Sequence, residues 1–313
     1  MADNKPVFGI IYGKSGRGKT FGITRAFAAD GVFVSPKRSI EAQTWFGVDL
    51  GKRLIEDNDF GTSDATDFIK KHGKKVRRII FDDYSLGVDA EVRRIRKSVS
   101  GWKVWERLVD KHYELRDAAL DADCDVWLVM HEQNPRTIQK DGHDKVIQGA
   151  PLVPGFVLPE KLPAMAQLVA RVVWDKGVGG GWPWVYQTGP DPEYQTKNRC
   201  GVATPHRFPP NLAEILRRGG RDVPYPKELP WMNKAVDMVA DTLLQEWSKG
   251  DEADTEGVLR AANKTFSDKG FDPRHILWAM SDGWARAKLV RAEQNVVDAW
   301  ITGVVSNDEA EEI

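Results

Sequence analysis

Eight residues near the start of the chain have the types and the spacing that phosphate binding requires. They form a complete G-x-x-x-x-G-K-[ST] loop, the Walker A motif, and are, in order, Gly13, Lys14, Ser15, Gly16, Arg17, Gly18, Lys19 and Thr20. Glycines let successive backbone N–H groups point at phosphate oxygens, while the lysine reaches the β- and γ-phosphates and the threonine hydroxyl binds Mg²⁺. The motif therefore predicts a site for ATP and Mg²⁺.

The residues around this loop have the pattern that the motif needs. The apolar run 7–12 predicts a buried strand before the loop, and residues 21–29 predict a helix after it. The partial positive charge of a helix N-terminus then adds to the phosphate site, and Phe21 joins the predicted nucleotide-binding residues. A glycine-rich turn that matches by chance is the alternative, which this context disfavours.

A second apolar run, 76–81, ends in two carboxylates and predicts a Walker B strand. Asp82 is the predicted Mg²⁺ residue. Asp83 is predicted to orient or deprotonate the attacking water, because a carboxylate beside a metal-bound phosphate suits that role. The alternative is that Asp83 caps the turn that follows, since aspartate is a preferred cap.

A third run, 125–130, leads directly into His131 and Glu132. Residues at the carboxyl ends of parallel strands face the ligand crevice of an open α/β sheet. His131 is therefore a candidate sensor of the γ-phosphate, with a structural histidine as the alternative. Glu132 is a rival to Asp83 as the water-activating base.

These three strand endings resemble the RecA-like core, and more closely the phage-type AAA-domain ATPases that include RecA-like single-strand annealing proteins. The resemblance spans about residues 5–210 and includes a proline-glycine stretch at 149–155 and a Lys-x-Arg element at 197–199. It implies an α/β fold, namely a RecA-like P-loop NTPase core with a mostly parallel sheet flanked by helices. A small C-terminal helical unit would follow the core.

The resemblance also implies an oligomer, a ring or a filament, that binds single-stranded DNA. Lys197 and Arg199 would act on ATP held by a neighbouring subunit, and the alternative is that both are surface cations. In RecA itself the catalytic glutamate lies just after the second strand, but here no acid follows residues 32–34 until Glu41. Three candidate bases therefore remain, in the order Asp83, Glu41 and Glu132.

Charge gives no overall nucleic-acid signature, because the net charge is −1. Cations are nevertheless clustered at 70–78 and at 93–97, the second on a helical stretch expected from about 88 to 120 that also carries Trp102 and Trp105. Such clusters attract phosphate backbones, and cations mixed with aromatics suit single strands. Solvated surface, and core packing for at least one tryptophan, are the alternatives.

Residues 134–149 are polar, lack periodicity and predict a mobile loop. The cationic side chains of this segment belong to Arg136, Lys140, His143 and Lys145. In a RecA-like core the loop after the sensor strand faces the central axis of the assembly and touches DNA, so the resemblance assigns this segment to DNA.

The chain divides into four predicted parts, which are the RecA-like core 1–222, a proline-rich linker 223–230, a helical unit 231–305 and an acidic tail 306–313. The helices or the tail are candidates for binding a protein partner.

The apolar runs are too short to span a bilayer, and the N-terminus is no signal peptide. A soluble protein without membrane contact is expected, in the cytoplasm (of the host, if phage-encoded). Cys124 and Cys200 fit neither a disulfide framework nor a zinc site, so both are expected to be reduced.

Three functions follow from these patterns. The first is a DNA-dependent oligomeric ATPase of phage recombination or replication that binds or anneals single strands. The second is a nucleotide-binding scaffold or DNA-packaging component with little turnover. A small-molecule kinase is the third, although no acceptor pocket or arginine-bearing lid is recognisable in the sequence.

Overall fold

The computed structural model of the chain describes residues 6–28, 30–37, 39–40, 50–140, 143–174, 184–200, 207–208, 212 and 215–216. The expected linker, helical unit and acidic tail lie outside these residues, and so does Glu41. Among the helices of the described ranges, none combines the length and the apolar character needed to cross a membrane.

The described strands form one large, mostly parallel sheet in the order β12-β10-β9-β1-β5-β4-β2-β3, with β11 paired to β9 and β8 paired to β5. The parallel strands are β1 (Phe8–Gly13), β2 (Gly31–Ser35), β3 (Leu54–Glu56), β4 (Arg78–Phe81), β5 (Asp125–Gln133) and β9 (Leu168–Trp174). The antiparallel additions are β8 (Ala150–Pro151), β10 (Trp184–Gln187), β11 (Lys197–Asn198) and β12 (Arg207–Phe208).

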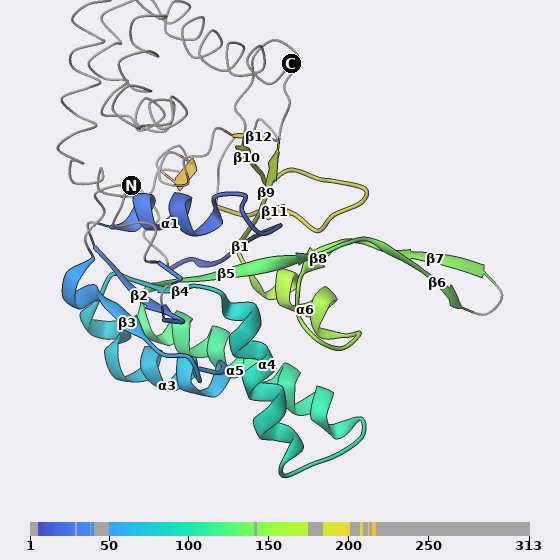
Figure 1. The fold of residues 1–313 in the computed structure, drawn as a ribbon, viewed down its shortest axis with the longest axis horizontal. Helices are drawn as coiled ribbons and strands as arrows, with labels where there is room; N and C mark the ends of the chain where they lie inside the picture. The colour runs from blue at the N-terminus through green and yellow to red at the C-terminus, as the bar shows by residue number, and fades with distance from the viewer. Residues whose placement is uncertain are drawn as a thin grey trace, which may run out of the picture.

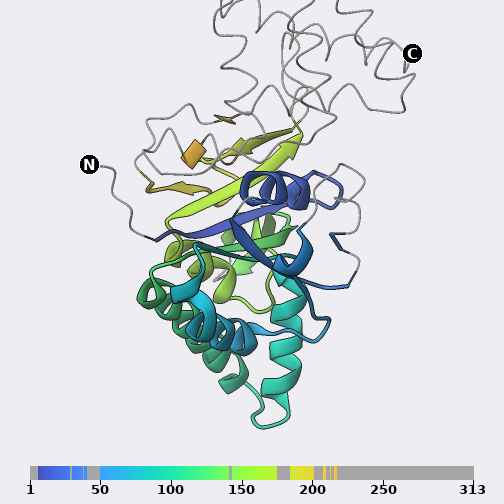
Figure 2. The same cartoon turned by 90° about the vertical axis from the view of Figure 1, so that its left-hand side faces the viewer.

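Helices cover both faces of this sheet, as Figures 1 and 2 show from two directions. One face carries α1 (Lys19–Phe27). The other face carries α3 (Thr62–His72), α4 (Tyr84–Arg96), α5 (Lys103–Ala122) and α6 (Leu158–Met165). Short 3₁₀ turns precede β3 at Gly51–Arg53 (η1) and follow α3 at Gly73–Lys75 (η2). The predicted α/β fold, a mostly parallel sheet flanked by helices, is confirmed.

The central strands pack against helices on both faces of the sheet, because successive side chains along a strand point to opposite faces. On β5, Leu128 and Met130 are buried in the cluster that includes the apolar residues of α3, α4 and α5. Trp127 points the other way and packs on Phe27 of α1, with 5.5 Å between ring centroids. Gly9 of β1 makes room for this indole, because a Cβ at that position would lie 2.4 Å from it.

The prediction of one helical stretch from about 88 to 120 is wrong. Two helices, α4 and α5, occupy this part of the chain and form a protrusion joined by a turn (Figure 1). Gly101 in the turn has φ +63°, a left-handed conformation that a side chain would resist. At the end of α4 the carbonyl of Ile95 accepts the backbone N–H groups of Ser98 and Val99 and also the Ser98 hydroxyl, each at 3.0 Å.

The loop expected at 134–149 is also different in the structure. An antiparallel pair, β6 (Arg136–Lys140) and β7 (His143–Ile147), extends from the sheet as a ribbon (Figure 1). Its strands contain β-branched residues, and the sequence Asp141-Gly142 between them is a favoured hairpin-turn pair. The strand-forming residues of this segment therefore outweigh the polar composition on which the loop prediction rested.

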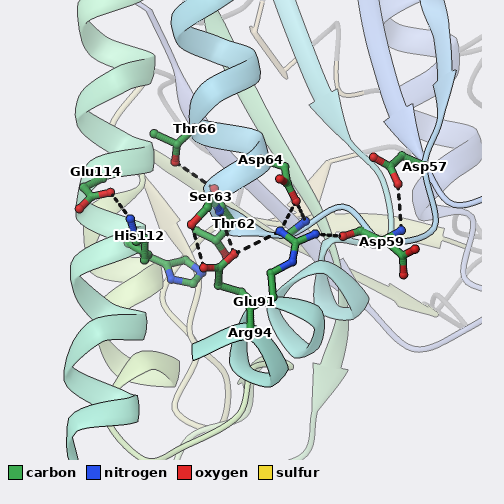
Figure 3. A network of polar contacts seen from close by, with 12 residues as sticks. Asp57, Asp59, Thr62, Ser63, Asp64, Thr66, Glu91, Arg94, His112 and Glu114 are labelled. Carbon is green, nitrogen blue, oxygen red and sulfur yellow. Dashed lines mark hydrogen bonds and ion pairs between the residues drawn. The ribbon is translucent and has the colours of Figure 1, made fainter. Parts of the chain in front are cut away.

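A polar network joins α3 to α4 beside the core (Figure 3). Glu91, which is 3% exposed, accepts hydrogen bonds from the backbone N–H and the hydroxyl of Ser63 at 3.0 and 2.8 Å. Arg94 pairs with Asp64 of α3. Because Glu91 satisfies an N–H in the first turn of α3, it stabilises that helix end as a cap does.

The predicted basic cluster at 70–78 lies at the amino end of β4, which is the far end of the strand from Asp82. Its lysines are exposed, in keeping with the solvated-surface alternative. Arg78 is only 2% exposed and pairs with Asp30 and with Asp125, the latter at 3.1 Å. Arg78 therefore has a structural role.

Both cysteines are buried, and neither forms a disulfide, as predicted. Burial raises the pKa of the Cys124 thiol to about 12, which leaves it protonated and unreactive at neutral pH.

Candidate active site

The predicted phosphate loop connects β1 to α1 and has the backbone shape that its glycines permit. Gly16 and Gly18 have φ of +72° and +74°, and Gly18 is the N-cap of α1. Gly13 is required for packing, since a Cβ there would lie 2.7 Å from the carbonyl oxygen of Val172 on β9. The N-terminus of α1 thus opens onto the loop, an arrangement that favours anions.

One cavity of about 220 Å³ gathers most of the predicted site residues. It is lined by Ser15, Gly16, Arg17, Gly18, Lys19, Thr20, Ser39, Asp82, Asp83, Val129, Met130 and His131. Residues from the ends of β1, β4 and β5 meet here because the carboxyl ends of parallel strands share one edge of the sheet.

Lys19 lies inside the loop, with only 8% of the residue exposed. Its ammonium donates to the backbone carbonyl of Lys14 at 2.8 Å. Burial lowers the pKa of Lys19, and the nearby carboxylates of Asp82 and Asp83 act in the opposite direction. Polyphosphate oxygens at the same place would favour the charged ammonium further.

Thr20 and Asp82 lie together at the position predicted for Mg²⁺. The hydroxyl of Thr20 donates to Oδ1 of Asp82 at 3.0 Å, and Asp82 is 2% exposed. Burial raises the pKa of Asp82, and hydrogen bonds from Thr20 and Ser39 oppose this rise. A hydroxyl and a carboxylate are oxygen ligands of the kind that Mg²⁺ takes.

These two residues do not amount to a complete metal cage. The described residues contain no group of three His, Cys, Asp or Glu side chains that could hold a metal ion. Mg²⁺ is commonly held by one or two protein groups together with water and substrate phosphates. The residues present therefore fit Mg²⁺ that arrives with a nucleotide.

Asp83 is in a strained conformation at the start of α4. It has φ +50°, which is uncommon for a residue with a side chain, and it occupies the N-cap position without making a side-chain cap hydrogen bond. The carboxylate instead lies against His131, with 3.2 Å between Oδ1 and the imidazole Nε2. The capping alternative is therefore not what this structure shows, and strain of this kind is often found at functional sites.

His131 and Glu132 point to opposite faces of the sheet because they are consecutive in β5. His131 enters the cavity with Lys19, while Glu132 lines a neighbouring one with Lys14 and Arg17. Both carboxylate oxygens of Glu132 accept hydrogen bonds from Arg171, at 2.8 and 3.3 Å, and the Arg171 guanidinium lies 3.1 Å over the Tyr194 ring. Glu132 is thus held by a buried ion pair and lines a different cavity from Asp82.

Lys197 and Arg199 lie apart from the phosphate cavity of their own chain. In β11, Lys197 pairs with Val169 of β9, whereas Gly13 pairs with Val172. That offset of three residues corresponds to about 10 Å of strand. The Lys197 ammonium donates to the carbonyls of Pro163 and Ala164 at the end of α6, at 3.4 and 2.6 Å, and Arg199 is exposed.

Two further predicted site residues receive no structural test. Glu41 lies outside the described residues, and of Phe21 only the backbone, in α1, belongs to them.

The structure adds a pair of serines that sequence reasoning missed. Ser39 lines the cavity and its hydroxyl donates to Oδ2 of Asp82 at 3.1 Å, while Ser35 at the end of β2 contacts both Ser39 and Asp82. The signal that could have found them was position, because residues that follow a parallel strand at its carboxyl end face the ligand crevice.

Comparison with known proteins gives little further information. No family model matches this chain, and no curated protein matches it. Among solved structures, the chain is similar to a KaiC-like protein of the hyperthermophilic archaeon Pyrococcus horikoshii, with 14% sequence identity and a TM-score of 0.36. That similarity covers 58% of this chain and 77% of the other.

Proposed function

We propose that this chain is a P-loop ATPase with a RecA-like core, which binds ATP with Mg²⁺ and hydrolyses it under the control of single-stranded DNA. The observation that carries the proposal is the cavity in which the phosphate loop meets a Walker B carboxylate, a second carboxylate and a histidine. A lysine, a hydroxyl and a buried carboxylate in this arrangement match the parts that phosphoryl transfer uses.

The binding roles follow from chemistry. Backbone N–H groups of the loop and the Lys19 ammonium bind the β- and γ-phosphates. Thr20 and Asp82 would hold Mg²⁺, which when bound neutralises charge that develops on the phosphate oxygens. Thr20 and Asp82 already lie side by side, in support of the role proposed for this pair.

Asp83 is the preferred base for the attacking water, and His131 the preferred sensor of the γ-phosphate. Asp83 lines the cavity, and its Oδ1 lies 3.2 Å from Nε2 of His131 with no other partner among the described residues. Glu132 is less suitable, because both of its oxygens are occupied by Arg171. Glu41 stays an alternative base on the grounds of sequence alone.

Two protrusions support the DNA part of the proposal. The β6–β7 ribbon follows the sensor strand, and at its base the Arg136 guanidinium lies 5.2 Å from the ring of Phe156, which is 66% exposed. The α4–α5 protrusion carries Trp102, 57% exposed, and the exposed Arg93 and Lys97. Exposed aromatics next to cations suit the bases and backbone of a single strand.

Part of the predicted basic patch at 93–97 has structural contacts instead. Arg94 pairs with Asp64, and the Arg96 guanidinium lies 5.7 Å from the ring of Trp105. Trp105 packs against the core, as predicted for at least one of the two tryptophans. DNA contact in this region is therefore assigned to Arg93, Lys97 and Trp102.

A homo-oligomer, a ring or a filament, completes the proposal. Lys197 and Arg199 lie away from their own phosphate cavity, so any action on a γ-phosphate would be on that of a neighbouring subunit. A phage recombination or replication role rests on the family resemblance alone.

The test is the rate of phosphate release from ATP by the wild-type chain, with and without single-stranded DNA. Turnover that rises with DNA is expected. Tight ATP binding with negligible turnover under both conditions would favour a scaffold or packaging component, and transfer of phosphate to a small acceptor would favour a kinase.

A further inference from the structure

Asp82 has an unusual environment for a carboxylate that is to meet a cation. It is 2% exposed, and each of its oxygens accepts a hydrogen bond from a hydroxyl. Thr20 donates to Oδ1 at 3.0 Å, and Ser39 donates to Oδ2 at 3.1 Å. Ser35 lies farther from Oδ2, at 3.4 Å. A buried carboxylate needs hydrogen-bond donors, and these hydroxyls supply them.

The donors can be assigned by counting hydrogens. Each serine hydroxyl has one hydrogen to donate. Ser35 and Ser39 are in direct contact, and of the two the oxygen of Ser39 is closer to Asp82. If each hydroxyl hydrogen is placed in the shorter of its contacts, Ser35 donates to Ser39 and Ser39 donates to Asp82. The two hydrogen bonds form a relay, and hydrogen bonds in such a chain strengthen one another.

The backbone holds this relay in place. Ser35 is the last residue of β2 and is 1% exposed. The N–H of Ser39 donates to the carbonyl of Pro36 at 3.2 Å, which forms a turn that returns Ser39 to the cavity. The N–H of Asp82 donates to the carbonyl of Val34 at 2.9 Å, so β2 and Asp82 are fixed to each other.

We propose that Ser39 is a positioning residue for Mg²⁺. By holding Oδ2 of Asp82 it fixes the rotation of the carboxylate and leaves Oδ1 on the side of Thr20, the residue that would bind the same ion. The inference rests on the proposed function, because it concerns the cation of that site. Neither Ser39 nor Ser35 belongs to the phosphate-loop motif or to the Walker B strand.

The proposal separates two contributions to nucleotide affinity. Among the described residues, the hydrogen bonds of Ser39 go to Ser35, Asp82 and Pro36 and not to the phosphate loop, so its removal is expected to affect the gain in affinity that Mg²⁺ brings. Groups that hold a metal ligand through a hydrogen bond typically change metal affinity by about 10- to 100-fold when removed. A comparable decrease is expected here.

The experiment is equilibrium binding of a fluorescent ATP analogue, measured by anisotropy in excess EDTA and in a series of Mg²⁺ concentrations. For Ser39→Ala we expect an unchanged Kd in EDTA and a gain from Mg²⁺ that is about 10- to 100-fold smaller than in the wild type. Ser39→Thr keeps the hydroxyl and should restore most of the gain. Ser35→Ala keeps the bond from Ser39 to Asp82 and should reduce the gain less than Ser39→Ala.

Ser98→Ala is the matched control, since that hydroxyl bonds within the α4–α5 protrusion, and it should behave as the wild type. An unchanged Mg²⁺ gain in Ser39→Ala would overturn the inference alone. An equal decrease of affinity in EDTA and in Mg²⁺ would overturn it as well, because it would mark Ser39 as a support of the loop. Absence of a Mg²⁺ gain in the wild type would instead overturn the proposed function.

Discussion

Nε2 of His131 in β5 lies 3.2 Å from Oδ1 of Asp83, which follows β4. Asp83 adopts a left-handed backbone conformation, and its side chain makes no cap on the helix that it begins. The strain is therefore not compensated by a capping hydrogen bond. This pairing places both groups at the cavity that the phosphate loop forms, and it is the basis for assigning the base and the sensor.

The first prediction separates two candidates for the catalytic base, Asp83 and Glu132. Asp83→Asn keeps the size of the side chain but removes the base, so ATP should still bind while hydrolysis falls by about 10²- to 10⁴-fold. Glu132→Gln should weaken the ion pair with Arg171 and reduce stability, with a smaller effect on the chemical step. Single-turnover hydrolysis of bound ATP measures this difference.

A fall in the chemical step for Glu132→Gln or Glu41→Gln, with Asp83→Asn near the wild-type rate, would reverse the assignment of the base.

The second prediction concerns single-stranded DNA and the β6–β7 ribbon. Replacing Arg136, Lys140 and Lys145 by glutamine should weaken DNA binding and flatten its dependence on salt, by about 0.7 in the slope of log K against log salt for each DNA phosphate that is no longer neutralised. The matched control is the same replacement of Lys70, Lys71 and Lys74, which are exposed near the amino end of β4, far from Asp82. An unchanged slope in the ribbon variant would make the ribbon cations ordinary surface residues.

The third prediction is that Lys197 and Arg199 act across a subunit boundary. A cation that reaches the γ-phosphate from a neighbour can contribute about 10³- to 10⁵-fold in rate. The double variant Lys197→Ala/Arg199→Ala and the variant Lys19→Ala should each be inactive alone and should regain partial ATPase activity when mixed. Absence of recovery in mixed oligomers verified by mass, or full activity of the double variant, would reject action in trans.

A separate experiment tests the structural role of Lys197. Its hydrogen bonds to the end of α6 predict that Lys197→Ala also lowers the melting temperature, whereas Arg199→Ala, at an exposed position, should not.

The fourth prediction is a pH dependence of stability. His112 is fully buried between Leu108 and Tyr84, and burial lowers the pKa of its imidazole to about 4. Because the unfolded chain takes up a proton near pH 6.5 and the folded chain does not, stability should fall as the pH drops from 6.5 toward 4. The full difference corresponds to about 3 kcal/mol.

Urea unfolding at several pH values measures this dependence. His112→Gln should be less stable at neutral pH. Between pH 6.5 and 4, however, its free energy of unfolding should change less with pH, because the variant lacks the one proton that the unfolded wild type takes up at His112. The same pH dependence in wild type and variant would show that other groups account for it.

Much of the site could be predicted because parallel strands bring their carboxyl ends to one edge of the sheet. Lys19, Thr20, Asp82, Asp83 and His131 all follow a strand in the sequence, and all line one cavity. The orientation of Glu132 was also accessible, since it follows His131 within a strand and must face the other side. What the sequence could not supply was the Arg171 partner, 39 residues away, that holds it.

Other features have only weak signals in the sequence. The break between α4 and α5 is marked by Gly101 with its positive φ, and the β6–β7 ribbon by a few β-branched residues inside a polar segment. Ser39 was missed because serine is common in turns, and only the return of the chain to Asp82 distinguishes it.

The most direct measurement of the central claim is ATP binding and phosphate release by Lys19→Ala beside the wild type, with Lys14→Ala as the matched control. Lys14 contributes its backbone carbonyl to Lys19, and its side chain is exposed, so Lys14→Ala should keep most of the activity. Lys19→Ala should keep the wild-type circular dichroism and melting behaviour and lose ATP binding, hydrolysis or both. Wild-type binding and turnover in Lys19→Ala would contradict the assignment of this loop as the ATP site.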